Sequence, residues 1–390
     1  MAPVDIDAPR PDSRTTVTLT SPAFAGVVGT FVLIGATSSI FGPLLTTFAQ
    51  HFAVSITTAG TALSLYYVGG VVGVVPGWLG VARLPGSVVL SSALLVVGFG
   101  AFGVALARNW TTFAFSVVVL GLGFGALVTA INSLLARTAD GGRPRRLSLV
   151  NAGFAVGAIA GPLLSVRVRV RDLESLFLGI ALVAILLAAT TRGLHASPHR
   201  TEHRPRNTQP ADRRRILATF LVAYVVYEAL ESAASGWMAT DLHQRGYSFT
   251  TSALVNAGFW MALAATRLLG GPAHQRWREV ALVIGGLILA IACAGAATVH
   301  DIAPVAYPLL GVALASVFPM GLVWYTRLSP RDSNGVSLVM LFAMLGGVIG
   351  PVVVDLTVAR LGVRAVPMTL AVLACLDLAV FASLTRVRRH

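Results

Sequence analysis

Two acidic residues lie in the middle of a long apolar stretch of the chain, where ionised groups are rare. Glu228 and Glu231 stand three positions apart within the segment 216–241. In a helix this spacing places both carboxyl groups on neighbouring parts of one face. Two carboxylates held so close in apolar surroundings cannot both stay ionised at low cost, so at least one is expected to take up and release a proton. The alternative is a structural pair that is hydrogen-bonded to its surroundings.

Neutral polar and aromatic side chains in other apolar stretches could bind an uncharged ligand. Aromatic rings stack on the apolar faces of a ligand, and amide groups orient its hydroxyl groups. For each of them the alternative is structural, because asparagines also bond neighbouring helices and aromatic residues also lie at the lipid headgroups. The candidates for substrate contact are Tyr227, Trp237, Asn132, Asn151, Asn256, Trp260, Trp324 and Tyr325.

Three further charged residues are interpreted as structural. Asp355 precedes Arg360 by five positions, which favours an ion pair or a contact at an outer gate. Asp377 lies deep in the last apolar segment and is expected to pack or pair within its own bundle. Arg267 ends an apolar segment and is expected to anchor at the cytoplasmic interface. With that Arg at the interface, no fixed cation remains near the membrane midplane, which argues against a dedicated carrier of organic anions or phosphate.

The composition requires membrane-spanning helices to position these residues. Of 390 residues, 55% are hydrophobic and 12% charged, and the mean hydropathy is +0.78, which excludes a soluble fold. A helix needs roughly 20 apolar residues to cross about 30 Å of hydrocarbon. Twelve segments qualify, so the sequence predicts an all-α membrane protein. They are 15–50, 52–82, 84–107, 109–136, 147–166, 175–191, 216–241, 246–266, 280–299, 302–326, 333–354 and 364–385.

An internal repeat divides the twelve segments into six and six. The stretch from Ser148 to Pro162 shares Ser, Leu, Val, Gly, Gly and Pro with the stretch from Ser337 to Pro351. Ser55 and Ser248 begin a second match at nearly the same offset. Parallel repeats of this kind are typical of transporters that bind a substrate between their halves. The expected parts are a tail (1–20), a six-helix bundle (21–192), a linker (193–215), a second bundle (216–386) and a tail (387–390).

The positive charge indicates topology rather than binding to nucleic acid. All 29 basic residues are Arg, and nearly all lie between apolar segments, where they contact lipid headgroups. If both termini are cytoplasmic, 22 Arg lie inside and 7 outside, as the positive-inside rule requires. The Arg-only composition, rich in Ala, Val and Gly, suggests a bacterial plasma membrane. The two cysteines lie in apolar segments, so neither a disulfide nor a metal site is expected.

Over essentially its whole length the chain resembles the major facilitator superfamily. Twelve helices, a long middle loop and the segment Gly157-Ala-Ile-Ala-Gly161-Pro162 carry the resemblance. It implies that fold, with two pseudo-symmetric six-helix bundles. Small residues let helix backbones approach closely where the bundles rock against each other, although ordinary tight packing would also use them. The candidates for this gating or packing role are Gly157, Gly161, Pro162, Gly346, Gly350 and Pro351.

The segment from Tyr227 to Trp237 resembles the Tyr, Glu and Trp pattern of the fucose/glucose:proton symporter branch, and Gly42-Pro43-Leu44 fits that branch as well. This resemblance implies a secondary active transporter of a small polar or sugar-like solute, with Glu231, aided by Glu228, carrying the proton. A proton gradient would supply the energy, without a cofactor. Those symporters commonly have acidic residues in helices one and four, whereas 15–136 contains none.

Two other functions remain open at this point. The apolar helices of the first half favour an exporter that exchanges protons for hydrophobic or amphipathic compounds. A non-transporting membrane receptor is the second alternative. An enzyme is not expected, because no phosphate-binding loop is present and Gly121-Leu-Gly-Phe-Gly125 lies inside an apolar segment. The expected partners are a small solute and membrane lipids, and the expected state is a monomer.

Overall fold

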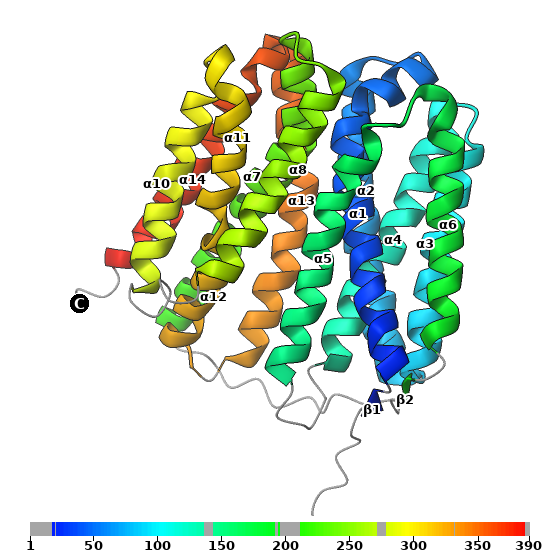
Figure 1. Ribbon diagram of the computed structural model, residues 1–390. Helices are drawn as coiled ribbons and strands as arrows, with labels where there is room; N and C mark the ends of the chain where they lie inside the picture. The colour runs from blue at the N-terminus through cyan, green and yellow to red at the C-terminus, as the bar shows by residue number, and fades with distance from the viewer. Residues whose placement is uncertain are drawn as a thin grey trace, which may run out of the picture.

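Figure 1 shows a bundle of upright helices in two groups. The computed structural model describes residues 18–19, 21–135, 143–191, 194–195, 211–270, 278–330 and 332–386. The first half contains α1 (Ser21–Phe52), α2 (Ile56–Arg83), α3 (Gly86–Leu106), α4 (Trp110–Leu135), α5 (Arg143–Ser165), η1 (Val170–Asp172) and α6 (Leu173–Thr190). The second half contains α7 (Ala211–Gln244), α8 (Phe249–Leu269), α10 (Glu279–Ala296), η3 (His300–Ile302), α11 (Ala303–Ala315), α12 (Val317–Leu328), α13 (Ser333–Leu361), η4 (Val363–Ala365) and α14 (Val366–Arg386).

Twelve helical segments of the described chain are long and apolar enough to cross a membrane. Large apolar side chains such as Phe99 and Phe115, each 67% exposed, lie on the surface of the bundle. Such a surface suits acyl chains and not water. The prediction of an all-α membrane protein with twelve spans is therefore confirmed.

Several element boundaries differ from the expected ones. α7 begins at Ala211, five residues before 216, and α13 continues to Leu361, beyond 354. Charged residues near these ends can stay helical outside the hydrocarbon. The length of an uncharged segment therefore underestimates the length of its helix. Of the expected tail 1–20 and linker 193–215, the structure describes β1 (Thr18–Leu19), β2 (Leu194–His195) and the start of α7. β1 and β2 pair antiparallel, while the tail 387–390 lies outside the described residues.

The two halves repeat the same local structure at the positions where the sequence repeats. The Ser55 hydroxyl accepts the backbone N–H of Thr58 at 3.0 Å and so caps α2. The Ser248 hydroxyl does the same for Thr251 at 3.0 Å at the start of α8. Such caps satisfy backbone groups that the first helical turn leaves unpaired. Each half therefore begins its second helix with the same device.

The repeated glycines lie where helices of one half touch. A methyl group added to Gly157 of α5 would collide with the Val32 carbonyl of α1. A methyl group added to Gly346 of α13 would collide with the Val225 carbonyl of α7. The described contacts of these two glycines therefore support the packing interpretation, with α5 on α1 and α13 on α7 as equivalent pairs.

Contacts between the halves lie toward one end of the bundle, which we call the α1–α2 end because α1 ends and α2 begins there (Figure 1). α2 packs on α13, α5 on α8 and α1 on α7. Leu63 of α2 lies against Gly236 of α7, and the ring of Phe154 in α5 lies 6.4 Å from that of Trp260 in α8. Leu63 and Gly236 lie toward the α1–α2 end of their helices, and Phe154 and Trp260 lie near the middle of theirs. The structure is therefore closed at that end.

The tenth span is interrupted, which the sequence-based prediction of one helix over 302–326 does not include. α11 ends at Ala315, and α12 begins at Val317 after Ser316. Pro319 explains the break, because proline has no N–H to donate to the carbonyl four residues earlier. The carbonyl of Ala315 is thus left free for another donor.

Candidate functional site

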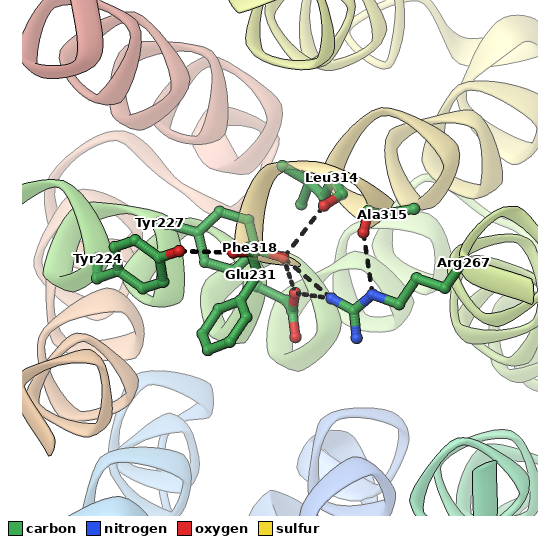
Figure 2. Close-up of polar contacts among 7 residues, drawn as sticks. All are labelled: Tyr224, Tyr227, Glu231, Arg267, Leu314, Ala315 and Phe318. Atoms are coloured by element: carbon green, nitrogen blue, oxygen red, sulfur yellow. Dashed lines mark hydrogen bonds and ion pairs between the residues drawn. The ribbon is translucent and has the colours of Figure 1, made fainter. Parts of the chain in front are cut away.

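A polar cluster forms beside this break in the second half (Figure 2). We define the Glu231 cluster as the side chains of Tyr227, Glu231 and Arg267 with the backbone carbonyls of Leu314 and Ala315. α7 supplies Tyr227 and Glu231 one turn apart, α8 supplies Arg267, and α11 supplies the two carbonyls. The site is therefore built by three spans of one half.

The Tyr227 hydroxyl connects the members of the cluster. It donates to Glu231 Oε2 and lies 3.2 Å from the Leu314 carbonyl, and it accepts from Arg267 Nη2 at 3.3 Å. The Tyr227 ring packs 5.7 Å from that of Phe318 at the start of α12. This packing fixes the orientation of the hydroxyl, so the carboxyl group of Glu231 is held by a rigid donor.

Arg267 provides a cation inside the protein, and its interpretation as an interfacial anchor is wrong. Its Nε donates to the Ala315 carbonyl at 3.0 Å, and its Nη2 lies 3.7 Å from Glu231 Oε2. The side chain is 38% exposed, compared with 12% for Glu231. The helix position gave the wrong expectation because a long Arg side chain can extend far from its own backbone. The argument against anionic substrates, which assumed that no such cation exists, therefore falls.

Glu228 lies next to this cluster, on the side of α7 that faces α13. Its Cβ is 2.8 Å from a methyl group added to Gly346. Tyr67 of α2 lies on Gly347 and is close enough to interact electrostatically with both Glu228 and Glu231. The two glutamates are therefore within electrostatic reach of a side chain from the first half.

Trp237, Asn256 and Trp260 lie at contacts between helices. The Asn256 side chain, fully buried, donates to the Ser235 carbonyl at 2.6 Å and so joins α8 to α7. Trp237 lies against Gly60, and Trp260 lies against Phe154, so both contact the first half. In the described chain, the indole nitrogens of both tryptophans are buried without a hydrogen-bond partner. A polar ligand could supply the missing acceptors.

Four other predicted substrate contacts lie apart from the Glu231 cluster. Trp324 stacks on Phe381 at 5.9 Å, and the Tyr325 hydroxyl donates to Asp332 at 2.7 Å, so both stabilise packing around α12. Asn132 is exposed and donates to the Val128 carbonyl of its own helix at 2.9 Å. Asn151 is exposed on α5. The structure therefore brings together Tyr227 and Glu231 of the predicted set.

Asp355 lacks the ion pair that the sequence suggests, whereas Asp377 is packed within its own half. Both are buried, and neither carboxyl group has a hydrogen-bond partner within the described residues. The expected ion pair of Asp355 with Arg360 is wrong, because five residues along a helix turn the two side chains about 140° apart. Asp377 packs near Tyr224, whose hydroxyl donates to the Phe318 carbonyl at 2.5 Å.

The described residues contain no group of three His, Cys, Asp or Glu that could hold a metal ion. A pocket of about 510 Å³ lies in the first half near His51, Arg108 and Glu174, at the α1–α2 end and away from the Glu231 cluster. An acid, a cation and a hydroxyl meet at Asp241, Arg245 and Tyr307 and also in the Glu231 cluster. In the Glu231 cluster, the Glu231 carboxyl group can exchange one proton, while Arg267 and Tyr227 stabilise its ionised form.

Comparisons with known proteins agree with this architecture. The profile of the Major Facilitator Superfamily matches residues 27–240 and 216–390. No curated protein matches the chain. A bacterial homolog of the human lysosomal transporter Spinster, solved in an inward-facing and occupied conformation, is 14% identical, with 94% of this chain and 97% of that chain covered and a TM-score of 0.78.

Two sugar transporters also have this fold. The Escherichia coli fucose:proton symporter is 16% identical, with 92% of this chain and 97% of that chain covered and a TM-score of 0.64. A D-xylose-proton symporter is 11% identical, with 92% and 96% covered and a TM-score of 0.75. At these identities the likeness shows a shared fold.

Proposed function

Because the chain belongs to the major facilitator superfamily, we propose that it is a secondary active transporter that moves a small polar or sugar-like solute together with protons. The family makes the chain a transporter and not an enzyme. Solute binds between the two halves, which open alternately to the two sides of the membrane. The protein works as a monomer in a bacterial plasma membrane, with both termini in the cytoplasm and no cofactor.

One observation carries the proton-coupling role. Glu231 is an acid inside a membrane span, mostly buried, and it is held by both a hydroxyl and a guanidinium group. Burying an ionisable carboxyl group in a membrane span costs free energy, so its presence there indicates a functional role. When Glu231 is ionised, Arg267 compensates its charge; when Glu231 is protonated, Arg267 is free to bind another group. Proton uptake therefore changes the charge of the site by one unit.

The test replaces Glu231 and measures transport in proteoliposomes. It separates the coupling of transport to protons from the binding of the solute. Glu231→Gln is expected to abolish pH-gradient-driven accumulation of the solute while exchange of labelled for unlabelled solute continues. The probes are radiolabelled fucose, glucose and xylose, chosen after a thermal-shift screen across pH. Glu174→Gln is the matched control, because Glu174 is an exposed acid at the start of α6. Full gradient-driven uptake by Glu231→Gln would refute the role of Glu231.

An exporter of hydrophobic compounds is the second candidate, supported by the lack of acidic residues over 15–136. In such an exporter, the apolar helices of the first half contact the hydrophobic compound. The same Glu231 carries protons in the direction opposite to that compound. Cells that express the chain would then tolerate toxic amphipathic compounds better without gaining growth on sugars. Growth on sugars without increased tolerance supports the symporter instead.

A further inference from the structure

Asp355 is a buried acid at the contact between the two halves, outside the Glu231 cluster. It lies on α13 six residues before the end of the helix and is 8% exposed. Gly60 of α2 lies directly against its carboxyl group, and a methyl group added to Gly60 would lie 2.5 Å from Cζ2 of Trp237. Two elements of the second half and one of the first therefore enclose this carboxyl group.

No charge compensates Asp355 in the described structure, because both of its oxygens are buried without a hydrogen-bond partner. Asp241, another acid toward the same end, is paired with Arg245 at 3.0 Å and Tyr307 at 2.6 Å. None of the described titratable groups on the elements packed against α13 forms a hydrogen bond or ion pair with Asp355. These groups are Tyr66, Tyr67 and Arg83 of α2, Arg213, Arg214, Arg215, Tyr224, Tyr227, Glu228, Glu231, Asp241 and His243 of α7, Tyr325 and Arg327 of α12, Arg364 of η4, and Cys375 and Asp377 of α14.

An ionised carboxylate without a partner is strongly disfavoured in such surroundings, so the neutral form is the one that fits this conformation. The enclosure depends on Gly60, which belongs to the other half. When the halves separate at the α1–α2 end, α2 moves away from α13 and water reaches the carboxyl group. The ionised form then becomes stable.

We propose that Asp355 is a second proton-binding site of this transporter and that its protonation holds the α1–α2 end closed. This inference rests on the alternating access proposed above, but not on the role of Glu231. The closed state binds the proton more tightly than the open state, so acid favours closure and alkali favours opening. Because one proton is involved, the ratio of open to closed molecules rises at most about tenfold for each pH unit.

The test measures opening of the α1–α2 end in the purified full-length chain in detergent, without solute or gradient. Leu63 is 4% exposed and lies against Gly236, so a Leu63→Cys thiol is covered when this end is closed. Cys293 and Cys375 are first replaced by alanine. A water-soluble maleimide reports the labelling rate across pH. Dividing that rate by the rate for Gln50→Cys, at an exposed position near the end of α1, removes the effect of thiol ionisation.

The normalised rate of Leu63→Cys is expected to rise with pH, by up to about tenfold per pH unit. In Asp355→Asn this pH dependence should disappear, while Asp301→Asn, which changes an acid that is 94% exposed, should keep it. Glu231→Gln should also keep it, so the two proposals can fail separately. If Asp355→Asn does not fold, Asp355→Ser takes its place. A rate independent of pH in the parent chain, or an unchanged slope in the Asp355 variant, would overturn the proposal.

Discussion

One hydroxyl group organises the Glu231 cluster. Tyr227 donates to Glu231, lies beside the Leu314 carbonyl and accepts from Arg267 (Figure 2). A second tyrosine, Tyr224, lies one turn earlier on α7 and donates to the Phe318 carbonyl at 2.5 Å. The two tyrosines have similar surroundings, and the described contacts join Tyr227, and not Tyr224, to the acid. They therefore form a natural pair of target and control.

Tyr227→Phe is expected to reduce proton-driven uptake by about ten- to a hundredfold, because a hydrogen bond to a charged group contributes roughly 1.5–3 kcal/mol. The phenylalanine ring keeps the packing on Phe318, so the folded state should persist. Tyr224→Phe should lower stability by about 1 kcal/mol and leave uptake nearly unchanged. Uptake in proteoliposomes and thermal melting measure the two effects. Equal loss of uptake in both variants would contradict a specific role for Tyr227.

At the scale of residues, the sequence predicts the two α7 members of the Glu231 cluster better than it predicts the groups that bind them. The i, i+4 spacing of Tyr227 and Glu231 already places them together, whereas Arg267 reaches the cluster only through the length of its side chain. Pro319 was an available signal, since a proline inside an apolar segment frees the carbonyl four residues earlier. No local pattern indicates that an Arg from another helix would bind that carbonyl.

At the scale of elements, helix contacts inside each half depend on glycines in equivalent positions. Gly157 allows α5 to touch α1, and Gly346 allows α13 to touch α7. The repeat in the sequence predicts that these positions correspond. It does not show which helices meet there, because that depends on how six spans pack. Helix number and order were thus predictable, and Pro319 indicated the break at Ser316, while the ends of α7 and α13 were not predictable from the uncharged segments.

Gly157→Ala is expected to destabilise the protein by about 1–3 kcal/mol, because the added methyl group collides with a backbone carbonyl that cannot move aside. Gly179→Ala is the matched control on α6, where nothing lies within 4 Å of an added methyl group. There alanine should stabilise the helix by up to about 1 kcal/mol. Thermal melts of the two purified variants should therefore shift in opposite directions. A melt of Gly157→Ala equal to that of the parent would refute the close contact.

On the scale of the whole molecule, the two halves meet toward the α1–α2 end. The described contacts there include apolar and aromatic side chains that lie on glycines, with Leu63 on Gly236 and Tyr67 on Gly347. The ion pairs described in the structure each lie within one half. Surfaces of this kind separate without breaking ion pairs, which suits repeated opening and closing. The repeat and the charge distribution predicted two halves, but not the end at which they are closed.

Cross-linking Leu63→Cys to Gly236→Cys with a short bifunctional thiol reagent is expected to stop transport, because it joins the halves where they must part. Cleavage of the linker should restore transport. The matched pair is Ser91→Cys with Thr191→Cys, whose native hydroxyls lie 2.5 Å apart within the first half. That cross-link should leave transport nearly unchanged. Full transport by the first cross-linked pair would show that these halves do not separate at this end.

The acceptor for Arg267 comes from the backbone and not from a side chain. Exchanging Ala315 for another small residue would therefore leave the anchor of the guanidinium group in place. At position 319, by contrast, every residue other than proline brings an N–H that competes for the same carbonyl. A substitution of Pro319 should therefore weaken the bond from Arg267 to the Ala315 carbonyl, although Pro319 contributes no polar side chain to the Glu231 cluster.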